Sequence, residues 1–214
     1  MSRRGRRSLV ERAAALGVTD QRVLDALRDT PRVAFVPPAA RLVADRDAPI
    51  PIGHGQTTSQ PSLIAHIVAA LGLRPTDRVL EVGTGLGYQT ALLAQVAGTV
   101  YSIDRFADLV ATAGGNLAAQ HIRNVELTVG DGTEGWPEHA PFDAIVVSAA
   151  FHEVPPPLVD QLADGGRLVQ PLGGDRGDDL LLFRKESGEL VVDRHLGAAR
   201  FVPLRGHHGL TDDG

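Results

Sequence analysis

Three glycines that follow a short apolar run mark the first place where this chain could do chemistry. The run 79–82 leads into Gly83-Thr84-Gly85-Leu86-Gly87 and then into a segment with helical spacing. Glycines at a strand-to-helix turn let the backbone bend sharply beneath a ligand, and adenosine-containing cofactors bind at such turns. A tight connection without any ligand is the competing interpretation, because a glycine-rich turn alone is weak evidence.

A bulky residue follows the last of these glycines. Tyr88 stands where a dinucleotide fingerprint has its third glycine. A helix that begins with tyrosine cannot approach a pyrophosphate closely, whereas a cofactor without phosphate makes no such demand. The spacing therefore favours S-adenosylmethionine over NAD.

Two carboxylates stand at or just after the ends of the next predicted strands. Asp104 ends the run 99–104, about 20 residues beyond the loop, where a carboxylate can accept hydrogen bonds from both ribose hydroxyls. Asp131 follows the run 125–129 and could accept from the exocyclic amine of adenine, although a turn that caps the strand explains it equally well. The predicted cofactor-binding residues are Glu81, Gly83, Thr84, Gly85, Gly87, Tyr88, Asp104, Asp131 and Gly132.

These residues need a sheet that brings strand ends together. Strands are predicted at 78–82, 99–104, 125–129, 142–147 and 167–170, with helices at 88–96, 106–119 and 156–162. Such alternation predicts a parallel sheet with right-handed crossovers, and the apolar run 142–147 is expected at its centre. The runs 180–185 and 190–196 predict a closing antiparallel hairpin.

The residues before the glycine loop differ in character. Helical spacing predicts helices at 8–16, at 20–27 with Thr19 and Asp20 as candidate caps, and at 61–71. Five prolines within 30–59 exclude a long helix or a central strand. We expect that segment to wrap over an active site, because long loops in compact enzymes are usually functional.

The composition is that of an ordinary folded protein. Of the 214 residues 43% are hydrophobic, and none is cysteine, which excludes disulfides and thiolate metal sites and fits the cytoplasm. The net charge of -5 disfavours nucleic acid as the main partner, and no run reaches the roughly 20 apolar residues of a membrane helix. The arginine cluster at 3–7 is interpreted as a frayed terminus. We expect one catalytic domain over 1–214, with an N-terminal segment at 1–77, a core at 78–206 and a tail at 207–214, and a monomer by default.

The chain resembles the protein-L-isoaspartate O-methyltransferase family from about residue 32 to residue 204. The most specific segment is GQTTSQP at 55–61, within PIGHGQTTSQP. Further matching segments are FVP at 35–37, LEVGTGLGYQTA at 80–91, YSID at 101–104, GDG at 130–132, PFDAIVVSAA at 141–150, GGRL at 165–168 and RFVPL at 200–204.

The resemblance implies an α/β fold, a doubly wound, mostly parallel seven-stranded sheet of the Rossmann-like methyltransferase type. It implies S-adenosylmethionine as cofactor, S-adenosylhomocysteine as product, and methylation of the free carboxylate of isoaspartyl residues, which starts repair through a succinimide. Ser59 is implied as the catalytic residue, although a serine before a helix with proline in its first turn can also be an N-cap. The implied substrate-binding residues are His54, Gln56, Thr57, Thr58, Ala149 and Ala150.

Some positions depart from the family pattern. The stretch Ala44-Asp45-Arg46-Asp47 lacks the family's aromatic residue, Asp104 replaces the usual glutamate, and Ser148 stands where threonine is common. These departures leave open a methyltransferase that acts on aspartate in one dedicated peptide to form an aspartimide. A cofactor-binding module without catalysis is a second alternative. A nucleic-acid amino-methyltransferase is disfavoured, because no Asn/Asp-Pro-Pro-aromatic run follows the fourth strand.

Methylation of a carboxylate does not require a strong general base in the active site. A carboxylate is already ionised at neutral pH, so its methylation needs positioning more than a strong base. Neutral donors such as Thr57, Thr58 and Ser59 would orient it without quenching its nucleophilicity. No metal is expected, because His207 and His208 have no carboxylate or third histidine at ligand spacing.

Overall fold

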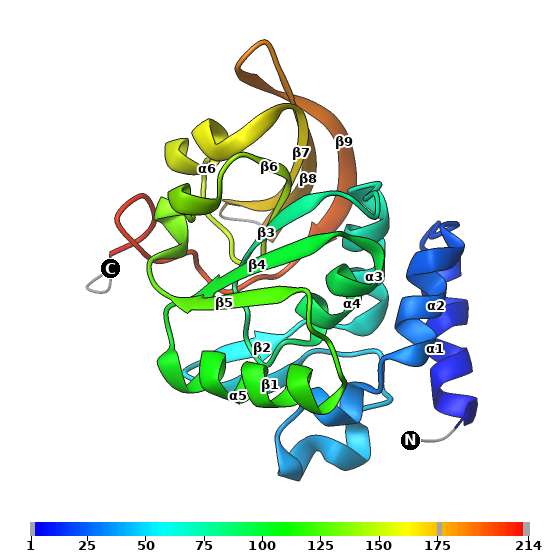
Figure 1. The fold of residues 1–214 in the computed structure, drawn as a ribbon. Helices are drawn as coiled ribbons and strands as arrows, with labels where there is room; N and C mark the ends of the chain where they lie inside the picture. The colour runs from blue at the N-terminus through cyan, green and yellow to red at the C-terminus, as the bar shows by residue number, and fades with distance from the viewer. Residues whose placement is uncertain (1–2, 175–176, 212–214) are drawn as a thin grey trace.

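A seven-stranded sheet forms the centre of the computed structural model, which describes residues 3–174 and 177–211 (Figure 1). The strand order is β5-β4-β3-β6-β7-β8-β9, and the pairs from β5 to β7 are parallel, whereas β7–β8 and β8–β9 are antiparallel. The strands are β3 (Arg78–Val82), β4 (Thr99–Asp104), β5 (Val125–Val129), β6 (Phe142–Val147), β7 (Leu162–Gly174), β8 (Gly177–Glu186) and β9 (Glu189–Ala199).

The predicted fold is confirmed, and β6 is the central strand. The ranges of β3, β4, β5 and β6 agree with the sequence prediction residue for residue. The prediction for β7 was too short, since the strand pairs with β6 on one side and along most of its length with β8 on the other. Long cross-strand pairing, rather than local apolar content, therefore sets its ends.

Helices cover both faces of the sheet. One core contains Val79, Val100 and Ala144 together with residues of the first three helices, and the other contains Leu80, Tyr101 and Ile145 together with Leu158 of α6. This alternation along each strand is the period of two that a sheet buried on both faces requires. The helices are α1 (Arg3–Ala15), α2 (Gln21–Asp29), α3 (Pro61–Ala70), α4 (Tyr88–Val96), α5 (Ala107–Ala119) and α6 (Pro156–Gln161).

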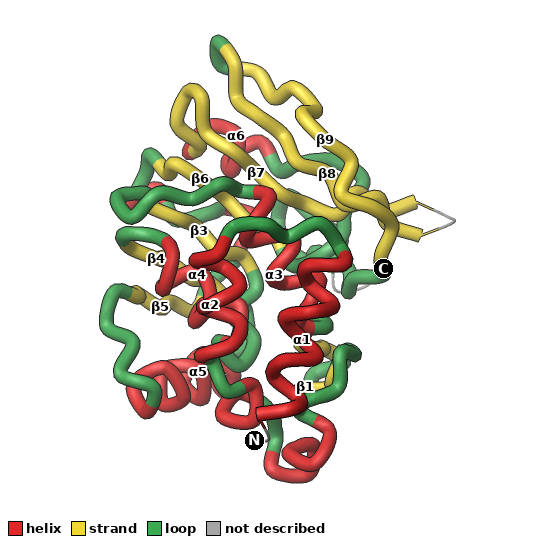
Figure 2. The backbone as a smooth tube through the Cα atoms, turned by 90° about the vertical axis from the view of Figure 1, so that its right-hand side faces the viewer, coloured by secondary structure: helices red, strands yellow, loops and turns green. Residues whose placement is uncertain are grey.

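The two N-terminal helices form an outer layer over α3 and α4 (Figure 2). Asp20 caps α2, since its side chain accepts from the amide of Arg22, as predicted. The expectation of a frayed end at 3–7 was wrong for the backbone, because α1 begins at Arg3. Arginine is a good helix former, so the pattern starting at Leu9 extends back over these residues.

The proline-rich segment contains more order than predicted. Two short 3-10 helices, η1 (Arg32–Phe35) and η2 (Pro38–Val43), precede a hairpin of β1 (Ile50–Gly53) and β2 (Gln56–Thr58). His54 and Gly55 form its turn with φ values of 51° and 70°. A two-residue turn with positive φ at both positions matches the twist of a hairpin. No helix among the described residues has the length and hydrophobicity needed to cross a membrane.

Candidate active site

A pocket of about 350 Å³ opens at the carboxyl ends of β3, β4 and β6. This is the edge of a doubly wound sheet where ligands bind. Its wall is lined by His54, Gln56, Val82, Gly83, Ile103, Asp104, Arg105, Phe106, Gly132, Ser148, Ala149, Val202, Pro203, Leu204 and Arg205. Six of the predicted site residues therefore line one pocket, and the hairpin and the C-terminal segment both contribute to it.

The glycine loop lies at the floor of this region and uses conformations that other residues rarely adopt. Gly83, Gly85 and Gly87 have φ values of 102°, 55° and 88°. A Cβ atom at Gly83 would lie 3.1 Å from Cβ of Ser148, and one at Gly85 would lie 3.1 Å from Cδ1 of Ile52. The loop thus keeps backbone open where a ligand without phosphate would lie.

Asp104 connects three parts of the pocket. Its Oδ2 accepts from the amide of Gly85 at 2.8 Å, and its Oδ1 accepts from the amide of Phe106 at 3.1 Å. Each carboxylate oxygen has a further lone pair, so both can still accept from ribose hydroxyls. The predicted ribose acceptor lies on the pocket wall and holds the glycine loop as well.

Glu81 lies beneath the loop and does not line the pocket. Its carboxylate is fully buried and accepts hydrogen bonds from Gln89, Thr90 and Ser102. Burial raises the pKa of Glu81 to about 7, although these three hydrogen bonds oppose the shift. Thr84 joins the network through the hydroxyl of Ser102 at 2.6 Å. Glu81 and Thr84 therefore support the loop from inside the protein.

Asp131 caps the short helix η3 (Gly132–Glu134). Oδ1 accepts from the amide of Thr133 at 2.9 Å, and Oδ2 accepts from the amide of His207 at 2.7 Å. Burial tends to raise the pKa of Asp131, but hydrogen bonds from His207 and Thr133 outweigh it and lower the pKa. Asp131 thus caps the helix η3 rather than the strand as the sequence interpretation had it, and Gly132 lines the pocket.

The tip of the β1–β2 hairpin closes one side of the pocket. The ring of His54 stacks on Phe106, with centroids 4.3 Å apart, and its Nε2 lies 2.8 Å from Oδ2 of Asp108 at the start of α5. Gln56 donates to the carbonyl of His54 at 3.1 Å. Both residues, predicted to bind substrate, thus line the same pocket as Asp104.

A smaller hollow of about 40 Å³ adjoins the pocket. It is lined by Ile52, Thr57, Thr58, Ser59, Ile64, Gly83, Thr84, Gly85, Leu86, Tyr88, Gln89 and Ser148. Gly83 and Ser148 line both hollows, so the two hollows share part of their wall. The structure therefore brings Thr57, Thr58 and Ser59, predicted from the resemblance, directly against the glycine loop.

Ser59 is not the cap of α3. The N-cap position is Gln60, without a side-chain cap, and the first turn is instead held by Asp47, which accepts from the amide and the hydroxyl of Ser62 at 2.9 and 2.7 Å. The cap interpretation of Ser59 was therefore wrong. Asp47 lies in the stretch that departs from the family pattern, and spacing in the sequence gives no hint of this contact.

A buried arginine that no sequence motif indicates holds Ser59 in place. Arg32 is 0% exposed and donates to the carbonyls of Ser59, Ala48 and Arg46 at 2.9, 2.9 and 3.0 Å. Its guanidinium lies 5.7 Å from the ring centroid of Tyr88. The charge is satisfied by carbonyl oxygens and an aromatic face, and burial lowers the pKa of Arg32.

Tyr88 has a polar atom without a partner. Its side chain is 2% exposed, and its hydroxyl makes no hydrogen bond to any described residue. Burial raises the pKa of Tyr88 strongly. Tyr88 lines the smaller hollow, and its hydroxyl is buried beneath that surface.

The two predicted alanines have different positions. Ala149 lines the larger pocket. Ala150 instead connects backbone, since its amide donates to the carbonyl of Val202 at 2.8 Å and its carbonyl accepts from Leu204 at 2.7 Å. These bonds place the RFVPL segment against the pocket. Ser148, whose hydroxyl accepts from Gln89 at 3.0 Å, is a further site residue that the prediction did not include.

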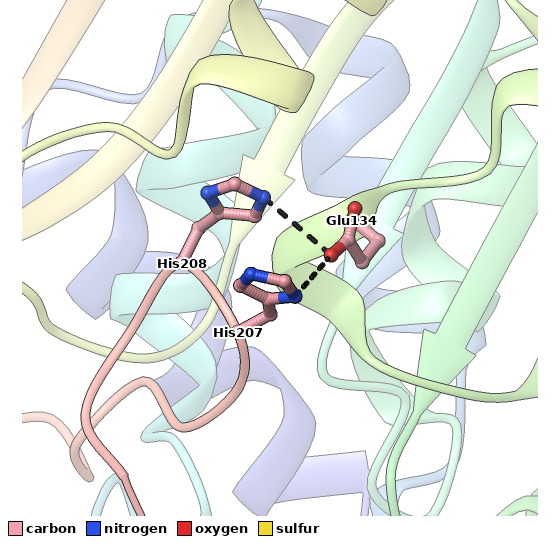
Figure 3. A group of neighbouring side chains, drawn as sticks. All are labelled: Glu134, His207 and His208. Atoms are coloured by element: carbon pink, nitrogen blue, oxygen red, sulfur yellow. Dashed lines mark ion pairs between the residues drawn. The ribbon is translucent and has the colours of Figure 1, made fainter.

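The fold also brings a carboxylate to the histidine pair near the C-terminus (Figure 3). Oε1 of Glu134 lies 3.2 Å from Nδ1 of His207 and 3.4 Å from Nε2 of His208. No ligand spacing is visible in the sequence here, because Glu134 comes from η3, far away along the chain.

Comparison with known proteins gives the family. The family model described as Protein-L-isoaspartate(D-aspartate) O-methyltransferase matches residues 4–209. A protein-L-isoaspartate O-methyltransferase of Methanoculleus marisnigri is 49% identical over 208 residues, which cover 97% of this chain and 94% of that protein. One of Roseiflexus castenholzii is 47% identical over 208 residues, 97% of this chain and 95% of that protein.

Solved structures with a similar fold come from the same family. A protein-L-isoaspartate O-methyltransferase superposes with a TM-score of 0.84 at 31% identity, over 95% of this chain and 67% of that one. A second, from Plasmodium falciparum in complex with S-adenosyl-L-homocysteine, has a TM-score of 0.78 at 27% identity, over 92% of this chain and 97% of that one. The chain belongs to the protein-L-isoaspartate O-methyltransferase family.

Proposed function

We propose that this protein transfers the methyl group of S-adenosylmethionine to the free carboxylate of L-isoaspartyl residues in damaged peptides and proteins. The observation that carries the proposal is the hollow that Thr57, Thr58 and Ser59 share with the glycine loop. It joins the segment most specific to the family to the place where the cofactor's reactive end would lie.

The residues of the larger pocket suit a nucleoside without phosphate. Asp104 would hold the ribose, Gly132 and Leu204 would lie against the base, and the ring of Phe106, stacked on His54, offers an aromatic wall. The positive-φ glycines 83 and 85 place no side chain in either hollow. When bound, the cofactor supplies an electrophilic methyl group on its sulfonium.

The hydroxyls of the smaller hollow would bind the substrate. Ser59 would donate to one carboxylate oxygen, while Thr57 and Thr58 line the same space. Arg32 fixes the backbone of Ser59 from behind, without a charged donor in the hollow. A neutral donor orients an anionic nucleophile and leaves its lone pair reactive, and no strong general base is required because the carboxylate is ionised at neutral pH.

Repair would follow from the ester. The backbone nitrogen that follows the esterified residue attacks the ester carbonyl, methanol leaves, and a succinimide forms. Water then opens either carbonyl of the ring and regenerates part of the normal aspartyl linkage. The protein needs to supply only the first step, which converts a poor leaving group into a good one.

We further propose that the protein acts on protein rather than on nucleic acid, in the cytoplasm and as a monomer. The net charge of -5 gives no broad positive field for phosphate, and a chain without cysteine suits a reducing compartment.

The products of one reaction test the proposed function. The protein is incubated with S-adenosylmethionine and an isoaspartyl peptide, and mass spectrometry follows the ester, the succinimide and the hydrolysed peptides in order. We expect a base-labile ester, then loss of methanol, then a mixture of aspartyl and isoaspartyl peptide. No ester on this peptide, with S-adenosylhomocysteine still bound by calorimetry, would contradict the proposal, and an ester on aspartate of a single peptide would favour the dedicated-peptide alternative.

A further inference from the structure

The cluster of Glu134, His207 and His208 stands outside the proposed reaction. Its three candidate ligand atoms all lie within 4.8 Å of one another (Figure 3). From this geometry we infer that the cluster is a binding site for a borderline divalent cation of the Zn²⁺ type, which fastens the C-terminal segment to the turn behind the cofactor pocket.

The two separations between Glu134 and the histidines suit ligands of one ion. Two ligands about 2.1 Å from a tetrahedral zinc ion lie roughly 3.4 Å apart. Oε1 of Glu134 is 3.2 Å from Nδ1 of His207 and 3.4 Å from Nε2 of His208. Both separations exceed the roughly 2.8 Å of a good charge-assisted hydrogen bond. The arrangement therefore fits two metal–ligand pairs better than two optimal ion pairs.

The choice of ligands selects the class of metal. Two imidazoles and one carboxylate match zinc and its first-row neighbours, whereas Mg²⁺ and Ca²⁺ prefer oxygen ligands alone. Three protein ligands leave room for water. Fractional side-chain exposures of 76% for His207, 46% for Glu134 and 32% for His208 leave the ion accessible from solvent.

Hydrogen bonds of the backbone hold the turn that carries the two histidines. The amide of His207 donates to Oδ2 of Asp131 at 2.7 Å, and the amide of His208 donates to the hydroxyl of Thr133 at 3.1 Å. Leu210 donates to the carbonyl of Leu204 at 2.9 Å and closes the turn. All three ligands are therefore held by one turn and η3, so binding must order only their side chains.

The position of the site gives the ion a structural role. Gly132 of η3 lines the larger pocket, as do Leu204 and Arg205 just before the histidines. An ion bridging Glu134 to the histidine pair would link these two walls. The three ligands lie together only in the folded chain. An ion bound by them would therefore stabilise the folded state and raise the melting temperature.

The test uses tag-free, chelator-treated full-length protein at about pH 7.5. Zn²⁺ binding is measured by calorimetry, and Co²⁺ is added to a second sample for its visible spectrum. We expect one ion per chain, a Co²⁺ spectrum of a four- or five-coordinate site, and a higher melting temperature with Zn²⁺.

Variants distinguish this site from other surface groups. His207→Ala with His208→Ala, and separately Glu134→Gln, should weaken Zn²⁺ binding by about tenfold or more. The alanines keep the backbone amides that hold the turn, so the fold should survive, which circular dichroism checks. His152→Ala is the matched control, because His152 faces Glu153 at 3.6 Å with both side chains exposed but is not part of the cluster. Equal binding by the double variant, or no bound ion in the unaltered protein, would overturn the inference.

Discussion

Gly85 and Asp104 are joined by a hydrogen bond of 2.8 Å from the amide of the first to Oδ2 of the second. It connects the glycine loop after β3 to the end of β4, two neighbouring parallel strands. The same carboxylate accepts from the amide of Phe106, so it also fixes the start of α5. One side chain thus holds together the glycine loop, the end of β4 and the start of α5.

Replacing this carboxylate should weaken cofactor binding. In Asp104→Asn the side-chain NH2 replaces one of the two oxygens, so one of the backbone amides of Gly85 and Phe106 loses its acceptor. The negative charge that would accept from ribose is lost as well. A hydrogen bond to a charged group contributes about 1.5–3 kcal/mol, so the dissociation constant for S-adenosylhomocysteine should rise by roughly tenfold to a hundredfold. Asp104→Glu, the residue usual in the family, should stay within a few-fold of the unaltered protein. Calorimetry measures both, and equal binding by the asparagine variant would remove Asp104 from the cofactor site.

Two glycines offer a matched pair of substitutions. A Cβ atom at Gly132 would lie 2.4 Å from Cγ1 of Val82 beneath the pocket, whereas one at Gly115, on α5, meets nothing within 4 Å. Gly132→Ala should therefore destabilise the protein and lower cofactor affinity. Gly115→Ala should stabilise it by about 0.5–1 kcal/mol, because alanine is the better helix former. Denaturant unfolding compares the two, and similar effects would contradict the close approach at η3.

The positioning role of Arg32 can be separated from ordinary stability. Arg32→Met leaves the carbonyls of Arg46, Ala48 and Ser59 without their donor, which should lower the free energy of unfolding by about 3 kcal/mol. The value of kcat/KM for peptide should fall more than the affinity for S-adenosylhomocysteine, because Ser59 lies in the smaller hollow.

Arg41→Met, at an exposed position nearby, is the control for Arg32 and should change neither quantity. A loss of cofactor affinity as large as the loss of kcat/KM in Arg32→Met would instead mean that the whole pocket collapses.

The pH dependence of stability should report on Glu81. Its pKa is about 7 in the folded protein against 4.5 for an ordinary glutamate. Between these values the folded state keeps a proton that the unfolded state has released. The contribution of Glu81 to the free energy of unfolding is therefore fully present below about pH 4.5, falls by up to about 3 kcal/mol as the pH rises to 7, and is constant above.

Glu81→Gln should remove this slope. The difference in free energy of unfolding between the two proteins, followed by denaturant titration from pH 5 to 8, isolates Glu81 from the other titrating groups. We expect the difference to shift in favour of the glutamine variant as the pH rises. A difference that stays constant over the range would show that Glu81 ionises normally.

The parallel core could be predicted because its signals are local. The ranges of β3, β4 and α4 follow from short apolar runs and a glycine turn, and the end of β4 at Asp104 places that carboxylate beside the loop in any doubly wound sheet. The loop, its carboxylate and the central strand β6 were therefore predictable.

Contacts between distant segments could not be predicted in the same way. Asp47 caps α3 from a separate loop, Arg32 binds carbonyls on two segments, and Glu134 meets the histidine pair through the turn after β5. Each depends on a backbone path that neither spacing nor periodicity encodes. The β1–β2 hairpin was missed for a different reason, since its turn places a residue other than glycine, His54, at positive φ and the prolines around it argued against strands.

The most direct measurement compares kcat/KM for methyl transfer to two synthetic peptides that differ only in an isoaspartyl or an aspartyl residue at one position. The two differ by the placement of one methylene, so the hollow at Ser59 must recognise where the carboxylate lies relative to the backbone. We predict a value for the isoaspartyl peptide at least about a hundredfold higher, and a large loss of it in Ser59→Ala with cofactor affinity unchanged. Equal values for the two peptides, or full activity in Ser59→Ala, would contradict the account.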